Sequence, residues 1–143
     1  MRVKDHVLWH LDHDYTRPIR DPLWGHIYLT EGLVSIVDSI EFQQLSRIKQ
    51  LEPAHLVYPG ATHTRLAHSL GVYYIAYRMI RALLVSEETP TIDREMVSAY
   101  LCAALLHDLG HFPFTHSLKE LPLEEHEALA ADIVREGDRK SVV

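Results

Sequence analysis

Apolar residues recur every three or four positions along the middle of the chain, between Thr30 and Leu106. This spacing places them on one face of a helix, and turn residues separate the helical segments. We expect helices over Leu33–Ile40 and Phe42–Leu51, from Thr62 or Thr64 to Val85, from Asp93 to near Gly110, and over Pro122–Arg135 with an end at Gly137. No segment alternates convincingly as a strand does, so the sequence predicts an all-α fold.

The first quarter of the chain is rich in turn-forming residues. Because Pro18, Asp21, Pro22 and Gly25 interrupt it, we expect loops and short extended structure over Met1–His26. This division gives an N-terminal arm over residues 1–20, a helical domain over 21–136 and a tail over 137–143.

Composition excludes several classes of protein. A chain of 143 residues that is 47% hydrophobic suits one small globular domain. Its formal charge of −6 argues against nucleic-acid binding as the main function, which usually needs a basic surface. A single cysteine, Cys102, excludes a disulfide framework and a cysteine-rich zinc module. There is no signal peptide and no apolar run that could span a membrane, so we expect a soluble, cytoplasmic protein.

Histidine is unusually abundant, at 11 of 143 residues, and it is the commonest metal ligand. The densest cluster is His107–His111, which contains Asp108 and is followed by His116 and His126. A helix C-terminus with a favourable histidine and a glycine cap would explain part of it but not His111 and His116. The zinc-peptidase pattern H-E-x-x-H is disfavoured, because Asp108 stands at the glutamate position and a glycine breaks the helix.

Two adjacent residues, His107 and Asp108, can reach one ion only at a helix end or an irregular turn. A third ligand must then come from another helix, and His68 is the obvious candidate. Arg65 lies one turn before His68 and would place an anion-binding cation beside the metal. A metal ion with a neighbouring arginine and several histidines suits phosphate ester hydrolysis, since the metal activates water and histidine can protonate the leaving group.

A wider set of motifs has the same order and spacing as in one known family. The motifs are Asp21–Ile27, Phe42–Leu45, Ile48–Leu51, Tyr58–Arg65, His68–Gly71, His107–His111 and Pro113–His116. With His68 and the His107–Asp108 pair, this string resembles the HD-domain metal-dependent phosphohydrolases. Within them it is similar to the deoxynucleotide triphosphohydrolase branch, which includes the SAM-and-HD-domain type.

The resemblance implies an all-α HD-domain helical bundle and a role for each matching residue. His68, His107 and Asp108 would bind one divalent metal ion, with Mn, Fe, Ni, Zn and Mg all left open. The catalytic residues facing the triphosphate would be His111, His116, His126 and Arg65, with His111 as a general acid. Gln50 and Leu51 would contact sugar or base, and Asp38 and Gln43 correspond to an activating-nucleotide site at a subunit contact.

The implied reaction is hydrolysis of a deoxynucleoside triphosphate to deoxynucleoside and triphosphate, by an enzyme that assembles as a homo-oligomer. The sequence also departs from the family. The family's fourth metal ligand is an aspartate on a later helix, and neither Asp132 nor Asp138 sits in the matching context. Trp24 replaces a usual histidine, and Phe42–Ser46 lacks two cations. The alternative is therefore a truncated or degenerate HD domain that binds nucleotide or a partner without catalysis.

Overall fold

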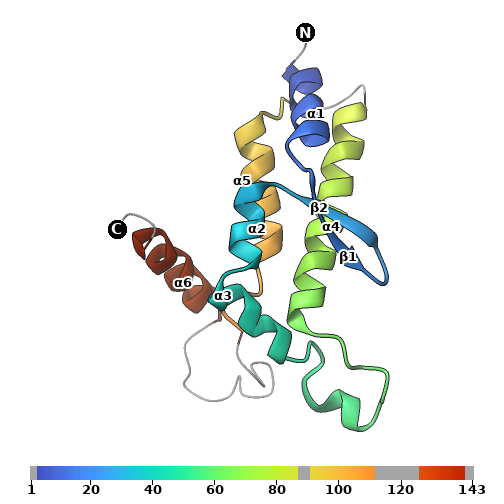
Figure 1. Ribbon diagram of the computed structural model, residues 1–143, viewed down its shortest axis with the longest axis vertical. Coiled ribbons are helices and arrows are strands. Elements are labelled where there is room, and N and C mark those ends of the chain that lie inside the picture. The colour runs from blue at the N-terminus through green and yellow to red at the C-terminus, as the bar shows by residue number, and fades with distance from the viewer. Residues whose placement is uncertain (1–2, 87–90, 112–125, 141–143) are drawn as a thin grey trace. The chain divides into compact units, whose positions relative to one another are not determined.

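The computed structural model describes residues 3–86, 91–111 and 126–140 (Figure 1). The helices and strands are α1 (Val3–His13), β1 (Arg17–Asp21), β2 (Gly25–Leu29), α2 (Glu31–Val37), α3 (Ile40–Gln43), α4 (Arg65–Val85), α5 (Arg94–Leu106) and α6 (His126–Lys140), with short 3-10 helices η1 (Gln44–Arg47) and η2 (Glu52–Leu56). The predicted all-α class is confirmed, and the only sheet among these residues has two strands. No helix in the described ranges has the length and apolar character needed to cross a membrane.

The chain folds as two compact units. The first contains residues 1–38 and 70–105, and the second contains residues 39–69 and 106–143. The core of the first unit is formed by hydrophobic side chains of its hairpin and helices, among them Ile27, Leu29, Tyr73, Leu84, Leu101 and Leu105. In the second unit, Phe42 and Leu45 are completely buried.

The expectation of loops and short extended structure over Met1–His26 was wrong for residues 3–13, which form α1. Only two of its residues, Val7 and Leu11, are buried, so the apolar pattern in the sequence is too sparse to reveal a helix. Contacts with α4 hold it in place instead. The hydroxyl of Tyr77 donates to the Leu11 carbonyl oxygen at 3.1 Å, and Arg81 pairs with Asp12.

The expectation that the chain lacks strands also needs correction, because β1 and β2 form an antiparallel hairpin from Arg17 opposite Leu29 to Asp21 opposite Gly25. The turn residues that suggested a loop make the hairpin turn. Asp21 Oδ1 accepts hydrogen bonds from the backbone N–H groups of Leu23 and Trp24 at 2.8 and 3.0 Å, and Gly25 has φ +77°. In such a turn the aspartate side-chain oxygen accepts the hydrogen bonds that a backbone carbonyl oxygen would otherwise accept.

The indole of Trp24 packs closely against α4 at Gly71. A Cβ atom at Gly71 would lie 2.9 Å from Trp24 Nε1, closer than real contacts allow. The indole also lies against Tyr74, with ring centroids 5.2 Å apart. Glycine at position 71 therefore lets the hairpin tip and α4 of the first unit pack together.

We expect Gly71→Ala to lower the free energy of unfolding by about 1–3 kcal/mol, since the added methyl group forces the indole to move in a packed environment. Urea denaturation measures the change. Gly60→Ala is the matched control, because a Cβ there would have no atom within 4 Å, and we expect it to change stability by less than about 0.5 kcal/mol. Equal stabilities of the two variants would contradict the packing argument.

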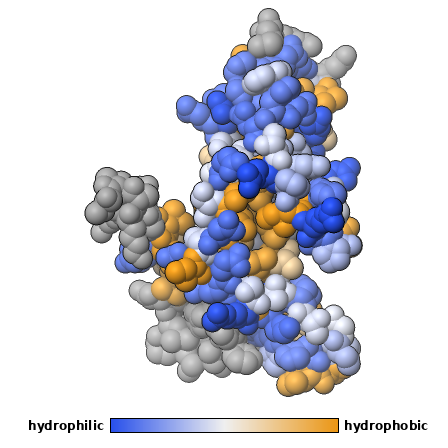
Figure 2. Space-filling view, in the orientation of Figure 1, coloured by the Kyte–Doolittle hydropathy of each residue, from blue (hydrophilic) through white to orange (hydrophobic). Residues whose placement is uncertain are grey.

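In the second unit, a short backbone pairing sets where α4 begins. Gln50 N–H donates to the His63 carbonyl at 3.0 Å, and Arg65 N–H donates to the Ile48 carbonyl at 2.9 Å. Thr64, one of the two residues predicted to begin this helix, caps it. Its hydroxyl oxygen accepts a hydrogen bond from the Ala67 N–H at 3.2 Å. The segment between the paired residues exposes Leu56, Val57 and Tyr58. Figure 2 shows a hydrophobic patch at the lower end of the view, where Figure 1 draws this segment.

The predicted helix boundaries hold for α4 and need correction elsewhere. Helix α5 ends at Leu106, before the predicted stop near Gly110. Helix α6 continues to Lys140, so Gly137 does not end it and the residues that we assigned to the tail are partly helical. Residues 122–125, where we expected this last helix to begin, lie outside the described residues.

Candidate metal centre

The second unit brings the first turn of α4 together with the turn that follows α5. Arg65 and His68 come from α4, and His107 and Asp108 come from the turn. Backbone hydrogen bonds define that turn, from Leu109 N–H to the Leu106 carbonyl and from His111 N–H to the Asp108 carbonyl, both at 3.0 Å. Because α5 has ended, two consecutive side chains can face the same point.

The three predicted metal ligands lie together. One ligand atom from each of His68, His107 and Asp108 lies within 4.8 Å of the others, and no other such group occurs among the residues that the structure describes. The rings of His68 and His107 have centroids 5.3 Å apart and meet edge to face. Two imidazole nitrogens and a carboxylate oxygen are ligands that suit divalent transition metals. The donor set therefore fits a metal ion.

Asp108 is the centre of the site, with a side chain that is 8% exposed. Its Oδ2 accepts a hydrogen bond from Arg65 Nη1 at 3.2 Å and lies 3.8 Å from His68 Nε2. Its Oδ1 lies 3.4 Å from His107 Nε2 and 3.3 Å from His111 Nδ1. Burying a carboxylate is costly unless it is paired or metal-bound, and here four nitrogen groups surround it.

Arg65 is a buried cation, only 1% exposed. Besides its bond to Asp108, its Nη1 lies 3.5 Å from Gln50 Oε1, whereas Nε and Nη2 have no hydrogen-bond partner among the described residues. The hydroxyl of Ser69, one turn further along α4, is also fully buried without a partner in these residues. Buried donors without acceptors are unfavourable, so they favour an anionic ligand at this point.

Electrostatics keep His68 in its metal-binding form. Burial lowers the pKa of this imidazole, and the neighbouring His107 and Arg65 lower it further, against the opposing effect of Asp108. A lowered pKa keeps the imidazole neutral near pH 7, and only the neutral ring can bind a metal ion.

The structure groups some of the other predicted residues and separates others. His111 is buried beside Asp108, and Gln50 contacts Arg65. Leu51 is half exposed. Asp38, at the end of α2, is exposed and belongs to the first unit, whereas Gln43 is exposed on α3 of the second unit.

Two predicted residues are not tested. His116 lies outside the described residues, and His126 opens α6 with a side chain that is also outside them. Asp132, considered as a fourth ligand, is exposed on α6 and pairs with Arg135 at 3.5 Å. The sequence analysis did not single out Ser69, because a serine in an apolar helix gives no pattern of its own.

Comparison with known proteins identifies the class. The profile of the HD domain matches residues 65–142, which is more than half of the chain and contains all three candidate ligands. The chain belongs to the HD-domain family. The resemblance noted in the sequence is thereby confirmed.

Within this family, the similar proteins are phosphohydrolases or proteins without an assigned function. The chain is 45% identical over 103 residues to human "Deoxynucleoside triphosphate triphosphohydrolase SAMHD1", covering 72% of this chain and 16% of that protein. It is 40% identical over 116 residues to the uncharacterized YwfO of Bacillus subtilis, covering 80% of this chain and 26% of that protein. The crystal structure of a phosphohydrolase from Bacteroides thetaiotaomicron superposes with a TM-score of 0.76 at 37% identity, covering 87% of this chain and 31% of that one. The chain thus spans under a third of the length of each.

Proposed function

We propose that this chain carries the catalytic site of a metal-dependent phosphohydrolase that acts on deoxynucleoside triphosphates. The observation that carries the proposal is the buried guanidinium of Arg65, with two free donor groups, hydrogen-bonded to a ligand of the candidate metal centre. Guanidinium donors match phosphate oxygens in geometry and charge. The similarity to a named deoxynucleoside triphosphate triphosphohydrolase supports the choice of substrate.

His68, His107 and Asp108 would hold the metal ion, which when bound lowers the pKa of a water molecule and polarises a phosphoryl oxygen. The identity of the ion is left open among Mn, Fe, Ni, Zn and Mg. Since His107 and Asp108 are consecutive, their common orientation depends on the tight turn after α5. Arg65 would stabilise negative charge that develops on the phosphate.

His111 is proposed as the general acid. Its Nδ1 lies 3.3 Å from Asp108 Oδ1, a charge contact without the geometry of a hydrogen bond, and this contact favours a proton on Nδ1. When the other ring nitrogen, Nε2, is also protonated, it is the atom that donates a proton to the leaving oxygen. The water oxygen adds to the α-phosphorus and releases one proton to solvent. The bond from phosphorus to the 5′ oxygen breaks, and that oxygen takes the proton from His111 Nε2 to leave as deoxynucleoside, with triphosphate as the other product.

The test is an assay of the tag-free chain loaded in turn with Mn²⁺, Fe²⁺, Ni²⁺, Zn²⁺ and Mg²⁺, with the four deoxynucleoside triphosphates and a simple phosphoester. We expect equal amounts of deoxynucleoside and triphosphate, separated by ion-exchange chromatography, and none from His68→Ala. Release of monophosphate and pyrophosphate, or turnover of the simple ester alone, would contradict the proposed substrate. Absence of turnover with every metal and compound would contradict the enzyme assignment.

The second candidate is an HD domain that binds nucleotide or a partner subunit without hydrolysis. The favouring observation is that only three ligands are grouped among the residues that the structure describes. Nucleotide binding by calorimetry without turnover would support it.

We also propose that the chain assembles with copies of itself, and light scattering after size exclusion measures this. An activating nucleotide at Asp38 and Gln43 would raise turnover in wild type but not in Asp38→Ala.

A further inference from the structure

A second pair of nitrogen ligands lies in the first unit, on α1. His6 and His10 are one helical turn apart, and their ring centroids are 4.5 Å apart at an interplanar angle of 76°. Two histidines at positions i and i+4 share a helix face and can bind one metal ion together. Neither belongs to the motifs that carry the family resemblance, so the pair is independent of the candidate metal centre.

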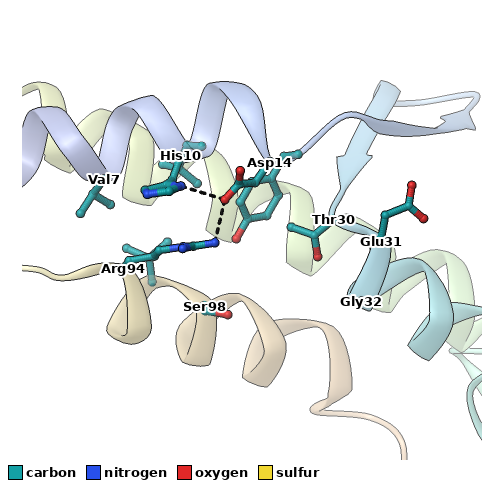
Figure 3. A pocket seen from close by; sticks show the side chains of 11 residues that line it. Val7, His10, Asp14, Thr30, Glu31, Gly32, Arg94 and Ser98 are labelled. Atoms are coloured by element: carbon teal, nitrogen blue, oxygen red, sulfur yellow. Dashed lines mark hydrogen bonds and ion pairs between the residues drawn. The ribbon is translucent and has the colours of Figure 1, made fainter.

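A carboxylate holds His10 in the orientation that a metal ligand needs. His10 Nδ1 lies 2.9 Å from Asp14 Oδ2, and Arg94 Nη2 donates to the same oxygen at 2.9 Å (Figure 3). The His10 side chain is only 15% exposed. A carboxylate acceptor keeps the proton on Nδ1 and leaves the lone pair on Nε2, and this support is common for metal-ligating histidines.

Both histidines border hollows between α1 and the start of α5. His6 lines a hollow of about 640 Å³ together with Asp93 and Glu95. His10 lines a second hollow of about 390 Å³, which also contains Asp14. There is thus room for water molecules as further ligands, and nearby carboxylates offset the charge of a cation and of Arg94.

We propose that His6 and His10 bind a divalent transition metal ion, Zn²⁺, Ni²⁺ or Cu²⁺, with water in the remaining positions. Asp14 is a positioning residue that acts through His10. A site whose protein ligands are imidazoles alone selects these ions over Mg²⁺ and Mn²⁺, and Cu²⁺ should bind most tightly. The site is distinct from the candidate metal centre, where a carboxylate contributes.

The same helix supplies a matched control. His13 stacks on Trp9 with centroids 4.2 Å apart, and its Nδ1 lies 2.7 Å from the Trp9 carbonyl oxygen. His13 is exposed, like His6, but its ring contacts Trp9 in the preceding turn of α1 and not the proposed pair. His13→Ala therefore removes a histidine from α1 without touching the proposed pair.

Trp9 also provides a local reporter, because its ring centroid is 5.1 Å from that of His10. The chain has two tryptophans, so Trp24→Phe leaves Trp9 as the only one. In this tag-free background, titration with Cu²⁺ should quench Trp9 fluorescence in a step that consumes one equivalent per chain, and binding at the candidate metal centre should not contribute to the quenching. His6→Ala and His10→Ala should each weaken the apparent affinity at least tenfold, Asp14→Asn by about 10–100-fold, and His13→Ala by less than twofold.

A calorimetric Zn²⁺ titration of the wild-type chain completes the test. The His6→Ala/His10→Ala double variant should bind one equivalent fewer, and circular dichroism checks that it keeps its helices. If the double variant proves unfolded, His6→Ala alone decides, since that side chain is exposed. Quenching that survives His6→Ala and His10→Ala, or that His13→Ala abolishes, would overturn the proposal.

Discussion

Replacing Asp108 with alanine is expected to remove the metal ion of the candidate metal centre, one equivalent per chain, and to lower phosphohydrolase activity on the order of 10³-fold or more. In the proposed site the carboxylate contributes a metal ligand and accepts a hydrogen bond from Arg65, and metal assistance supplies several kcal/mol of transition-state stabilisation. The variant also leaves Arg65 as a buried cation without its carboxylate, which costs about 3–5 kcal/mol of stability. Metal content by mass spectrometry, turnover and urea denaturation measure the three effects.

Asp108→Asn keeps the volume and a hydrogen-bond acceptor for Arg65, so it folds more stably than the alanine variant while still lacking the charged ligand. The matched control is Asp132→Asn, because that carboxylate is exposed on α6 and makes one ion pair with Arg135. We expect the control to bind metal as wild type does and to change stability by less than about 0.5 kcal/mol. Normal metal content in both Asp108 variants would show that the ion is held elsewhere.

The grouping of the three candidate metal ligands could be predicted from the sequence, because their chemistry is visible in the residue types. A His–Asp pair at the end of an apolar helix is unusual, and His68 follows an arginine by three positions in the preceding apolar helix. The contact between Arg65 and Asp108 could not be predicted from spacing alone, since the two residues are 43 positions apart. Packing of two turns brings them to 3.2 Å, and it also buries Ser69.

The elements that the sequence analysis missed share a physical reason. The helix α1 buries only Val7 and Leu11, so it depends on hydrogen bonds and ion pairs to residues more than 60 positions away. The hairpin is short, and its turn residues looked like those of a loop. Tertiary contacts decide the structure in both places, whereas α4 and α5 carry enough apolar residues to be recognised from periodicity.

Replacing Arg65 with glutamine is expected to lower kcat about 10²–10³-fold, the usual effect of removing one preorganised donor to a developing negative charge. The metal content should match that of the wild-type chain, because His68, His107 and Asp108 are all kept. The kcat of Arg65→Lys should lie between those of the wild type and Arg65→Gln, since lysine supplies a point charge without the planar guanidinium group that fits phosphate. Single-turnover kinetics and metal analysis of the same samples measure the outcome.

Arg135→Gln is the control for loss of positive charge, because that side chain is 75% exposed on α6. It should leave kcat within twofold of the wild-type value, on the order expected for an exposed charge.

The comparison with Asp108→Ala separates two roles of Arg65. If Arg65→Gln loses metal as fully as Asp108→Ala does, then the arginine acts mainly by holding the Asp108 carboxylate in place. If metal remains while kcat falls, the two free donors of the buried guanidinium act on the phosphate itself.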